Sequence, residues 1–281
     1  MNNTVIAQAS SDLHLHTSNS DGKFTSQELL EKVNKVGLKC ISIVDHDTIN
    51  GIDEAVNLGK KMDIEVIPGV ELSTTLGGMD VHIIGYFIDY KNEILLKHLN
   101  IFREERLKRA KRIVDKLHRL KVPLDYESVL AQAQNAALGR PHIANAMVEN
   151  GFVSSYQEAF NQYIRNGGPA YEAKYNFSPK QAISLINKCG GVSFIAHPGC
   201  YLNDDAISEL IKMEIDGIET VHPGHTPQTT ESLKKIANTY FLLESGGSDF
   251  HGGLRDDEDA FGKYTIPYKF VSAMKRRLFW Y

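Results

Sequence analysis

Histidine and carboxylate side chains recur at short spacings along this chain. His14 and His16 are two residues apart, and Asp249 and His251 repeat that spacing near the other end. In a β-strand the side chains at i and i+2 point to the same side, so the members of each pair face together. A buried imidazole without a partner is costly. Neutral imidazole and carboxylate are ligands that Zn²⁺, Mn²⁺ and Fe²⁺ accept, so this pattern indicates a metal site.

Further groups of the same kind lie on predicted strands or just after them. They are Asp21, Asp45, His46, Asp47, Glu71, His82 and His197. The carboxyl ends of parallel strands converge at one edge of a sheet, so groups far apart in the sequence can meet there. A single strand-end histidine is more often a hydrogen-bonded core residue, and one pair two residues apart is weak evidence. The whole set together predicts a metal centre with more than one ion.

Short apolar runs alternate with helical patterns through most of the chain. The runs that predict buried strands are residues 39–47, 64–73, 79–88, 190–199, 215–224 and 240–252. Helices are predicted over 25–37, 178–190 and 203–217, the first two from a Ser or Thr near the start and a glycine at the end. Strand and helix in alternation predict an α/β fold of parallel strands joined by crossover helices.

The middle of the chain breaks this alternation. Residues 97–120 have the apolar spacing of a long amphipathic helix, and shorter helices are predicted over 127–135, 141–149 and 155–165. We find no convincing strand between residues 97 and 168. The sequence therefore predicts a discontinuous α/β domain, 1–96 with 169–281, interrupted by a helical insertion at 97–168.

Composition excludes several classes of protein. The 281 residues carry a formal net charge of −4, so the molecule as a whole is not an obvious polyanion binder. Three cysteines without a CxxC pair argue against a disulfide scaffold and predict a reducing, cytoplasmic setting. No apolar run approaches the roughly 18 residues of a membrane span, and residues 1–12 lack the basic start of a signal peptide.

Seven segments, taken in order, resemble the PHP (polymerase and histidinol phosphatase) family. They are "DLHLHTSNSDG", "IVDHDTINGI", "IPGVELS", "VHIIGYFID", "GRPHIANAMVENG", "FIAHPG" and "GSDFHG", which span about residues 11–253. The chain is most similar to the stand-alone phosphoesterases of that family, including those that act on nucleotides and short RNA. The resemblance implies a distorted seven-stranded β/α barrel that holds two or three divalent ions, Mn²⁺, Fe²⁺ or Zn²⁺.

The resemblance also implies which residues hold each ion. His14, His16, Glu71 and Asp249 would bind the first, and Glu71 would bridge to a second completed by His82 and His197. The third would be held by Asp21, His46 and His251. Asp21 stands where many relatives have a histidine, so the sequence leaves open whether the third site is filled.

A phosphoester is anionic, and its hydrolysis needs a nucleophile and neutralised oxygens. A hydroxide that bridges two metal ions can attack at neutral pH while the ions hold the phosphate oxygens. Arg140 and His142 begin a predicted helix next to Pro141, where anions bind well, so they are candidate phosphate contacts. His225 is a candidate phosphate contact or proton donor to the leaving oxygen. His222 has no assigned role.

The leading hypothesis is a metal-dependent phosphoesterase that removes phosphate, or a terminal nucleotide, from nucleotides or short oligonucleotides. One alternative is a phosphatase of a small metabolite such as histidinol phosphate. Others are an amidohydrolase, and a non-catalytic module that binds nucleic acid or a polymerase. The basic helix 97–120 is either a solvated face or a track for a nucleic-acid tail. The sequence implies no membrane and no obligate protein partner.

Overall fold

A computed structural model of the chain describes residues 10–133 and 136–279. The expectation about a leader falls mostly on residues 1–9, which lie outside the described residues. The chain forms two compact units, Met1–Leu96 with Phe177–Tyr281, and Lys97–Asn176. The division into a barrel domain and an insertion ending at residue 168 stays a prediction.

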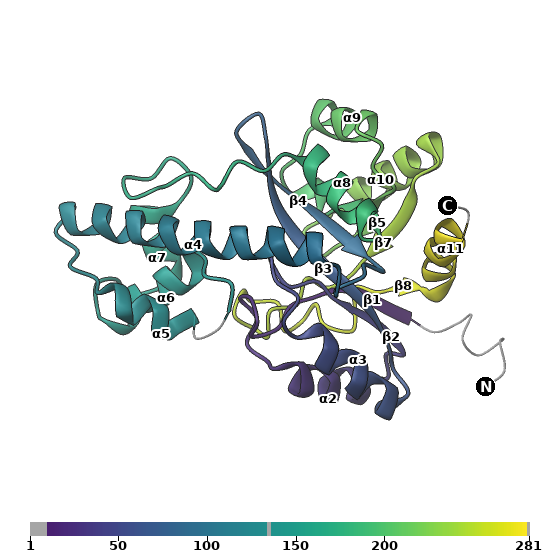
Figure 1. Ribbon diagram of the computed structural model, residues 1–281, viewed down its shortest axis with the longest axis horizontal. Coiled ribbons are helices and arrows are strands. Elements are labelled where there is room, and N and C mark those ends of the chain that lie inside the picture. Colours follow the sequence, from purple (N-terminus) through teal and green to yellow (C-terminus); the bar gives the residue numbers. More distant parts are fainter. Residues whose placement is uncertain (1–9, 134–135, 280–281) are drawn as a thin grey trace. The chain divides into compact units, whose positions relative to one another are not determined.

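The first unit is built on a nearly closed sheet in the shape of a barrel (Figure 1). Its strands are β1 (Ser10–Leu15), β2 (Cys40–Ile43), β3 (Glu65–Leu76), β4 (Met79–Tyr86), β5 (Val192–Ile195), β6 (Gly217–Val221), β7 (Leu243–Gly246) and β8 (Ile266–Pro267). They are hydrogen-bonded in the order β7-β6-β5-β4-β3-β2-β1-β8. A bridge between Leu15 and Phe250 brings the region after β7 against the end of β1. The predicted α/β barrel is confirmed.

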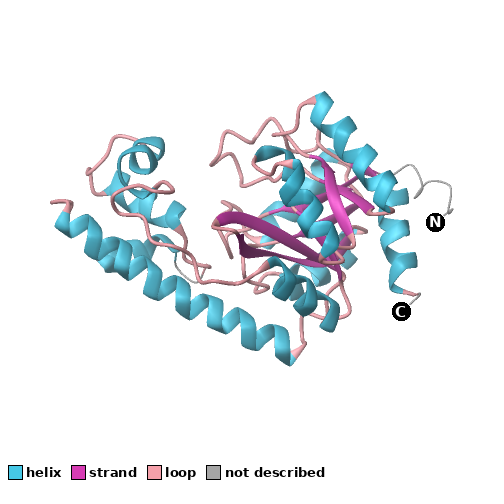
Figure 2. Cartoon of the chain, turned by 90° about the horizontal axis from the view of Figure 1, so that it is seen from above, coloured by secondary structure: helices cyan, strands magenta, loops and turns pink. Residues whose placement is uncertain are grey.

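Helices pack against the outer side of this sheet, as Figures 1 and 2 show. They are α2 (Ser26–Val36), α3 (Ile52–Met62), α8 (Pro179–Lys188), α9 (Asp204–Lys212), α10 (Pro227–Tyr240) and α11 (Tyr268–Leu278). Thr25 caps α2 in a capping box with Glu28, and Gly37 ends the helix in a left-handed conformation. Ser178 and Gln181 form the same box at α8. The local signals in the sequence therefore set the boundaries of α2 and α8 closely, whereas the helix predicted over 203–217 ends at Lys212.

The expectation of parallel strands throughout is wrong in one region. β1, β2 and β3 are parallel to one another, as are β5, β6 and β7, but β4 is antiparallel to both β3 and β5. Only Gly77 and Gly78 separate β3 from β4, and both have positive φ. A two-residue connection makes a hairpin, because a parallel pair needs a crossover of a dozen or more residues. The two-residue β8 adds an antiparallel strand to the seven expected.

The apolar side chains of this unit form two buried clusters. One contains Leu13, Ile84, Tyr86 and Phe194 together with residues of α11. The other contains Leu15 and Phe250 with apolar residues of α2 and α3. Because side chains alternate along β1, its leucines lie in the core and His14 lies on the opposite side of the strand.

The second unit consists of helices. They are the part of α4 (Glu93–Arg119) from Lys97 onward, α5 (Tyr126–Ala133), α6 (Arg140–Glu149), α7 (Tyr156–Ala159) and the π-helix η1 (Phe160–Ile164). Its core includes Ile113, Leu117, Ile143, Met147 and Ile164. Among its described residues there is no strand, as expected. None of the chain's described helices is long and apolar enough to cross a bilayer.

Candidate metal centre

The nine residues predicted as metal ligands lie in groups at one edge of the barrel. His14 and His16 come from the end of β1, and His46, His197, Asp249 and His251 follow β2, β5 and β7. His82 reaches the same edge by another route. It lies near the start of β4, opposite Ser73, because β4 runs antiparallel to β3. The ends of the parallel strands and the beginning of an antiparallel one thus meet at a single place.

The first cluster consists of His14, His16, Glu71 and Asp249. The Nε2 atoms of the two histidines are 3.1 Å apart. The Nε2 of His14 lies 3.3 Å from Glu71 Oε2 and 3.2 Å from Asp249 Oδ1, and the Nε2 of His16 lies 3.4 and 3.1 Å from the same oxygens. A tetrahedron of ligands with bonds of about 2.0–2.1 Å has edges of about 3.3–3.4 Å. The distances between the two nitrogens, and from each nitrogen to the two oxygens, are therefore close to those between ligands of one ion.

The second cluster is Glu71 with His82 and His197. The Oε1 atom of Glu71 lies 2.9 Å from His82 Nδ1 and 3.0 Å from His197 Nε2. The other oxygen, Oε2, faces the first cluster and also lies 3.1 Å from His46 Nδ1. Glu71 is fully buried and presents one oxygen to each of two clusters. This is the arrangement that a carboxylate bridging two cations requires.

The third cluster is Asp21, His46 and His251. His251 Nδ1 lies 2.7 Å from the backbone oxygen of Asp249 and donates to it, which leaves the lone pair on Nε2. That Nε2 faces Asp21 Oδ1 at 3.4 Å, and neither atom has a hydrogen-bond partner. Two buried acceptors that face each other in this way fit a cation between them. Asp21 Oδ2 instead pairs with the guanidinium of Arg255.

The charges of the site reinforce one another. Burial alone would raise the pKa of Glu71, but the imidazoles of His46, His82 and His14 hold it well below its ordinary value. Burial lowers the pKa of His14, but the carboxylates of Glu219, Asp249 and Glu71 outweigh it and raise that pKa well above its ordinary value. The carboxylates are thus kept ionised. Their field would favour a divalent cation beside the imidazoles as it favours a proton on them.

The chemistry of the donor set indicates which ions these clusters could hold. Imidazole nitrogens and carboxylate oxygens dominate it, and the unpartnered buried atoms include His16 Nδ1, Asp21 Oδ1 and His251 Nε2. These are the donors that Zn²⁺, Mn²⁺ and Fe²⁺ accept. The residues fit two or three closely spaced divalent ions. A barrel with such donors gathered at the strand ends is suited to chemistry assisted by metal ions.

A carboxylate that sequence reasoning missed holds two of the ligands. Glu219 on β6 accepts a hydrogen bond from His14 Nδ1 at 2.9 Å and one from the backbone N–H of His197 at 2.6 Å. The first bond fixes the proton of His14 on Nδ1 and leaves Nε2 free to bind a metal. Its signal in the sequence was a glutamate inside the apolar strand "GIETV", where an unpaired charge is costly.

Two buried aspartates organise the backbone around the ligands. Asp12 accepts from the backbone N–H of His14 at 3.2 Å and from the Ser248 hydroxyl at 2.6 Å. Burial raises the pKa of Asp12 to about 7. Asp45 accepts from the backbone N–H of Thr17 at 2.7 Å and from the Ser20 hydroxyl at 2.5 Å, which orders the loop that carries Asp21. Asp45 therefore supports the third cluster from behind.

The backbone is strained at two of the predicted ligands. His197 has φ +31° and Asp249 has φ +50°, in the left-handed region that few non-glycine residues adopt. Such strain persists where the surroundings over-determine it, and it gathers at functional sites. Gly247 allows the approach of this loop to β1, since a Cβ there would lie 2.4 Å from the backbone nitrogen of His14.

Each of the three predicted substrate contacts makes a hydrogen bond to the backbone. Arg140 and His142 lie on the first turn of α6, in the unit Lys97–Asn176. Arg140 Nη1 donates to Ile164 O at 3.1 Å, and His142 Nδ1 accepts from the backbone N–H of Gly139. His225 binds two backbone groups, the N–H of Gly199 at 3.2 Å and the carbonyl of Thr220 at 3.3 Å. Their roles toward substrate stay predictions.

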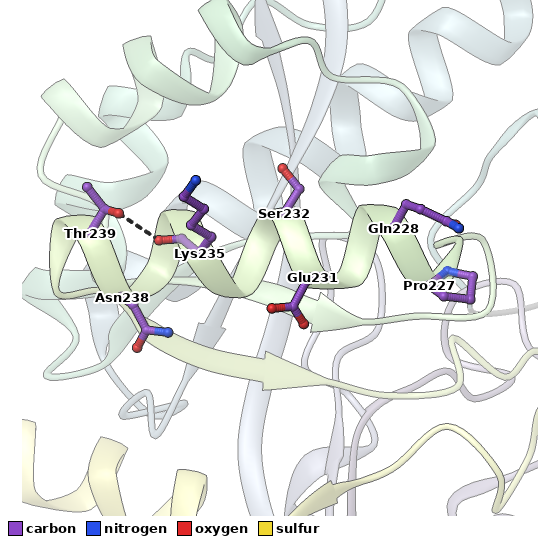
Figure 3. A pocket seen from close by; sticks show the side chains of 7 residues that line it. All are labelled: Pro227, Gln228, Glu231, Ser232, Lys235, Asn238 and Thr239. Carbon is purple, nitrogen blue, oxygen red and sulfur yellow. Dashed lines mark hydrogen bonds between the residues drawn. The ribbon is translucent and has the colours of Figure 1, made fainter.

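A separate hollow on the barrel unit has a different character. Figure 3 shows that its lining side chains all come from α10 and include Gln228, Glu231 and Lys235. The buried Leu233 and Ala237 belong to the same helix, which packs on β6 and β7. The seven lining residues include no histidine, so this hollow has none of the metal-binding chemistry of the strand ends.

Comparison with known proteins identifies the family. A family model described as the PHP domain matches residues 12–168. The 5'-3' exoribonuclease of Haemophilus influenzae is 35% identical over 246 residues, which cover 85% of this chain and 89% of that protein. The 3',5'-nucleoside bisphosphate phosphatase of Chromobacterium violaceum is 29% identical over 86% of this chain and 87% of its own length.

A crystal structure from Bifidobacterium adolescentis, of a protein provisionally classed as a metal-dependent phosphoesterase, superimposes with a TM-score of 0.88. It is 31% identical, and the match covers 95% of this chain and 96% of that one. The chain belongs to the PHP domain family and is a metal-dependent hydrolase of phosphoric esters.

Proposed function

We propose that this protein hydrolyses phosphate esters at the ends of nucleotides or short oligonucleotides. The observation that carries the proposal is Glu71, which is fully buried and turns one oxygen to each of two imidazole clusters. The proposal is supported by relatives named as an exoribonuclease and as a nucleoside bisphosphate phosphatase. Their shared chemistry is the hydrolysis of a phosphoester in a nucleotide.

Two ions would be held by the first and second clusters, and Mn²⁺, Fe²⁺ and Zn²⁺ all suit these donors. When bound, the ions supply an activated water and neutralise the phosphate oxygens. The chain's own residues do the rest. Glu71 sets the spacing between the two clusters, and Glu219 keeps the proton of His14 on Nδ1, away from the site. A third ion at Asp21, His46 and His251 completes the proposal.

Arg140, His142 and His225 are the proposed contacts to the substrate phosphate. The first two lie at the N-terminal turn of α6, where the positive end of the helix dipole favours an anion. His225 follows β6, on the same loop as His222. To donate a proton to a leaving oxygen, His225 would first have to release its bond from the N–H of Gly199. We propose a cytoplasmic setting, which is supported by free thiols at Cys40, Cys189 and Cys200.

The test is phosphate release from a panel of substrates, with Mn²⁺ present and after removal of metal. The panel holds nucleoside 5'-monophosphates, 3',5'-bisphosphates, a short 5'-phosphorylated RNA and histidinol phosphate. Product analysis of the RNA by mass separates loss of the terminal phosphate from loss of a nucleotide. We expect metal-dependent turnover of at least one nucleotide substrate.

Turnover of histidinol phosphate alone would replace the proposed substrate class with a small metabolite. A protein that holds its metal and turns over nothing in the panel would contradict the proposed activity and favour a binding role. The Glu71→Ala variant is the negative control, because it removes the bridging carboxylate and leaves the surface of the molecule unchanged.

A further inference from the structure

His222 is a buried histidine beside the metal centre that the ligand set does not include. It directly follows β6 and is 8% exposed. The backbone N–H of Gly224 donates to its Nδ1 at 3.0 Å. A nitrogen that accepts a hydrogen bond carries the lone pair, so the proton of the neutral ring lies on the other nitrogen, Nε2. The turn after β6 thus fixes the tautomer of His222.

That Nε2 lies 3.3 Å from Asp249 Oδ2. The other oxygen of the carboxylate, Oδ1, lies 3.2 and 3.1 Å from the Nε2 atoms of His14 and His16. The two oxygens of Asp249 are therefore divided between two neighbours. Oδ2 accepts from His222, and Oδ1 faces the donors of the first cluster.

Cys200 and His225 lie near His222, so an alternative role for His222 is as a ligand in a soft metal site of one thiol and two imidazoles. The hydrogen bonds argue against it. His225 uses one nitrogen toward the N–H of Gly199 and the other toward the carbonyl of Thr220, while His222 uses its two toward Gly224 and Asp249. A metal ion bound here would displace the hydrogen bonds that His222 and His225 already make to the backbone.

We propose that His222 is a positioning residue for the first metal ion. Its Nε2–H holds Oδ2 of Asp249, so that the carboxylate offers Oδ1 alone to the ion beside His14 and His16. Asp249 has a left-handed backbone conformation that few non-glycine residues adopt, and the bond from His222 gives its side chain a fixed contact. The inference rests on the metal centre of the proposed function and concerns metal affinity, so it is tested without substrate.

The experiment compares His222→Met with His222→Gln. The two side chains have similar length, but only glutamine keeps an N–H group that can reach Asp249 Oδ2. Mn²⁺ is titrated into metal-free protein by calorimetry, and the occupancy is checked by elemental analysis. We expect His222→Met to weaken the tightest Mn²⁺ site by about 10- to 100-fold, as the loss of an outer hydrogen bond to a ligand does. His222→Gln should recover most of that affinity.

Cys200→Ser is the matched control. The Sγ atom of Cys200 lies 3.6 Å from His222 Nδ1, so this variant disturbs the surroundings of His222 and leaves the bond to Asp249 in place. It should bind Mn²⁺ as the native chain does. Circular dichroism compares the fold and thermal stability of all three variants.

Native affinity in His222→Met would overturn the inference. So would an equal loss in His222→Met and His222→Gln, since it would show that the ring fills space rather than holding a carboxylate. A native chain that binds no divalent ion would overturn the metal centre itself. A native chain that binds Mn²⁺ tightly but turns over no substrate would overturn only the proposed activity and leave His222 in its role.

Discussion

The first and third clusters of the metal centre use the same kinds of side chain but differ in charge. The first cluster has two carboxylates, Glu71 and Asp249. Both of them lie next to the imidazoles of His14 and His16. The third has one carboxylate, Asp21, and one of its oxygens is paired with Arg255. A divalent cation is therefore attracted by two negative charges in the first cluster, and in the third by a carboxylate whose charge a guanidinium already balances.

The spacing of the donor atoms alone is therefore not enough to rank the metal affinities of the two clusters. Asp21 Oδ1 and His251 Nε2 face each other without a partner and would accept an ion. The nearby guanidinium opposes the same ion by charge. Coulombic interaction with Arg255 and His251 holds the pKa of Asp21 well below its ordinary value, against the effect of burial. We expect two tight sites and a third that is weaker and exchanges faster.

The largest effect should follow the loss of the bridging carboxylate. Glu71→Ala removes the oxygens that face both the first and second clusters, so we expect phosphate release to fall by about three orders of magnitude or more. The metal content, measured by elemental analysis after desalting, should fall with it. Glu54→Ala, on the exposed face of α3, is the control and should leave both quantities unchanged.

Full activity and full metal content in Glu71→Ala would refute the ligand assignment altogether. It would also remove the basis for comparing the first cluster with the third.

A smaller effect is expected from Glu219→Gln. Glutamine can accept from only one of the two N–H groups, of His14 and His197, that Glu219 now serves. We expect Mn²⁺ affinity at the two tight sites to weaken by about 10- to 100-fold and the weak site to change little. Calorimetric titration measures both. Glu244→Gln on β7 is the matched control, because its carboxylate accepts a hydrogen bond from the hydroxyl of Thr220, which is not a predicted ligand.

A uniform loss of affinity at every site would contradict this prediction. It would show that Glu219 supports the fold as a whole rather than the ligands of the first and second clusters.

The smallest effect, and the sharpest test of the comparison, is Arg255→Met. Without the guanidinium, the second oxygen of Asp21 is released and the negative charge of its carboxylate is no longer balanced. We therefore expect the Mn²⁺ affinity of the weak site to rise by several-fold, up to about tenfold. The readout is the third phase of a Mn²⁺ titration together with the number of ions retained on desalting. Lys263→Met removes an exposed cation paired with Asp259 four residues away, and it should have no such effect.

A third site that stays as weak in Arg255→Met as in the native chain would show that charge is not what separates the two clusters. The spacing of Asp21, His46 and His251 would then be the cause.

Much of the centre could be predicted because its signals are local. The pairs His14 and His16, and Asp249 and His251, show their common side through spacing alone, and the capping residues of α2 and α8 mark the helices between strands. The direction of β4 was missed, although Gly77 and Gly78 signal a hairpin. Arg255 and Glu219 were missed because nothing near them in the sequence shows their partners.

The sequence by itself determined the chemistry of this protein, because residue types and their spacing within each strand fix which donors exist and which way they face. It also determined the alternation of strands and helices, and the helical stretch that interrupts it. The family resemblance implied how the donors are grouped, and only the tertiary structure decided which neighbouring side chains hold them in place. Contacts such as Glu219 with His14, His222 with Asp249 and Arg255 with Asp21 join residues 27 to 234 positions apart. Such pairs form only when the barrel closes.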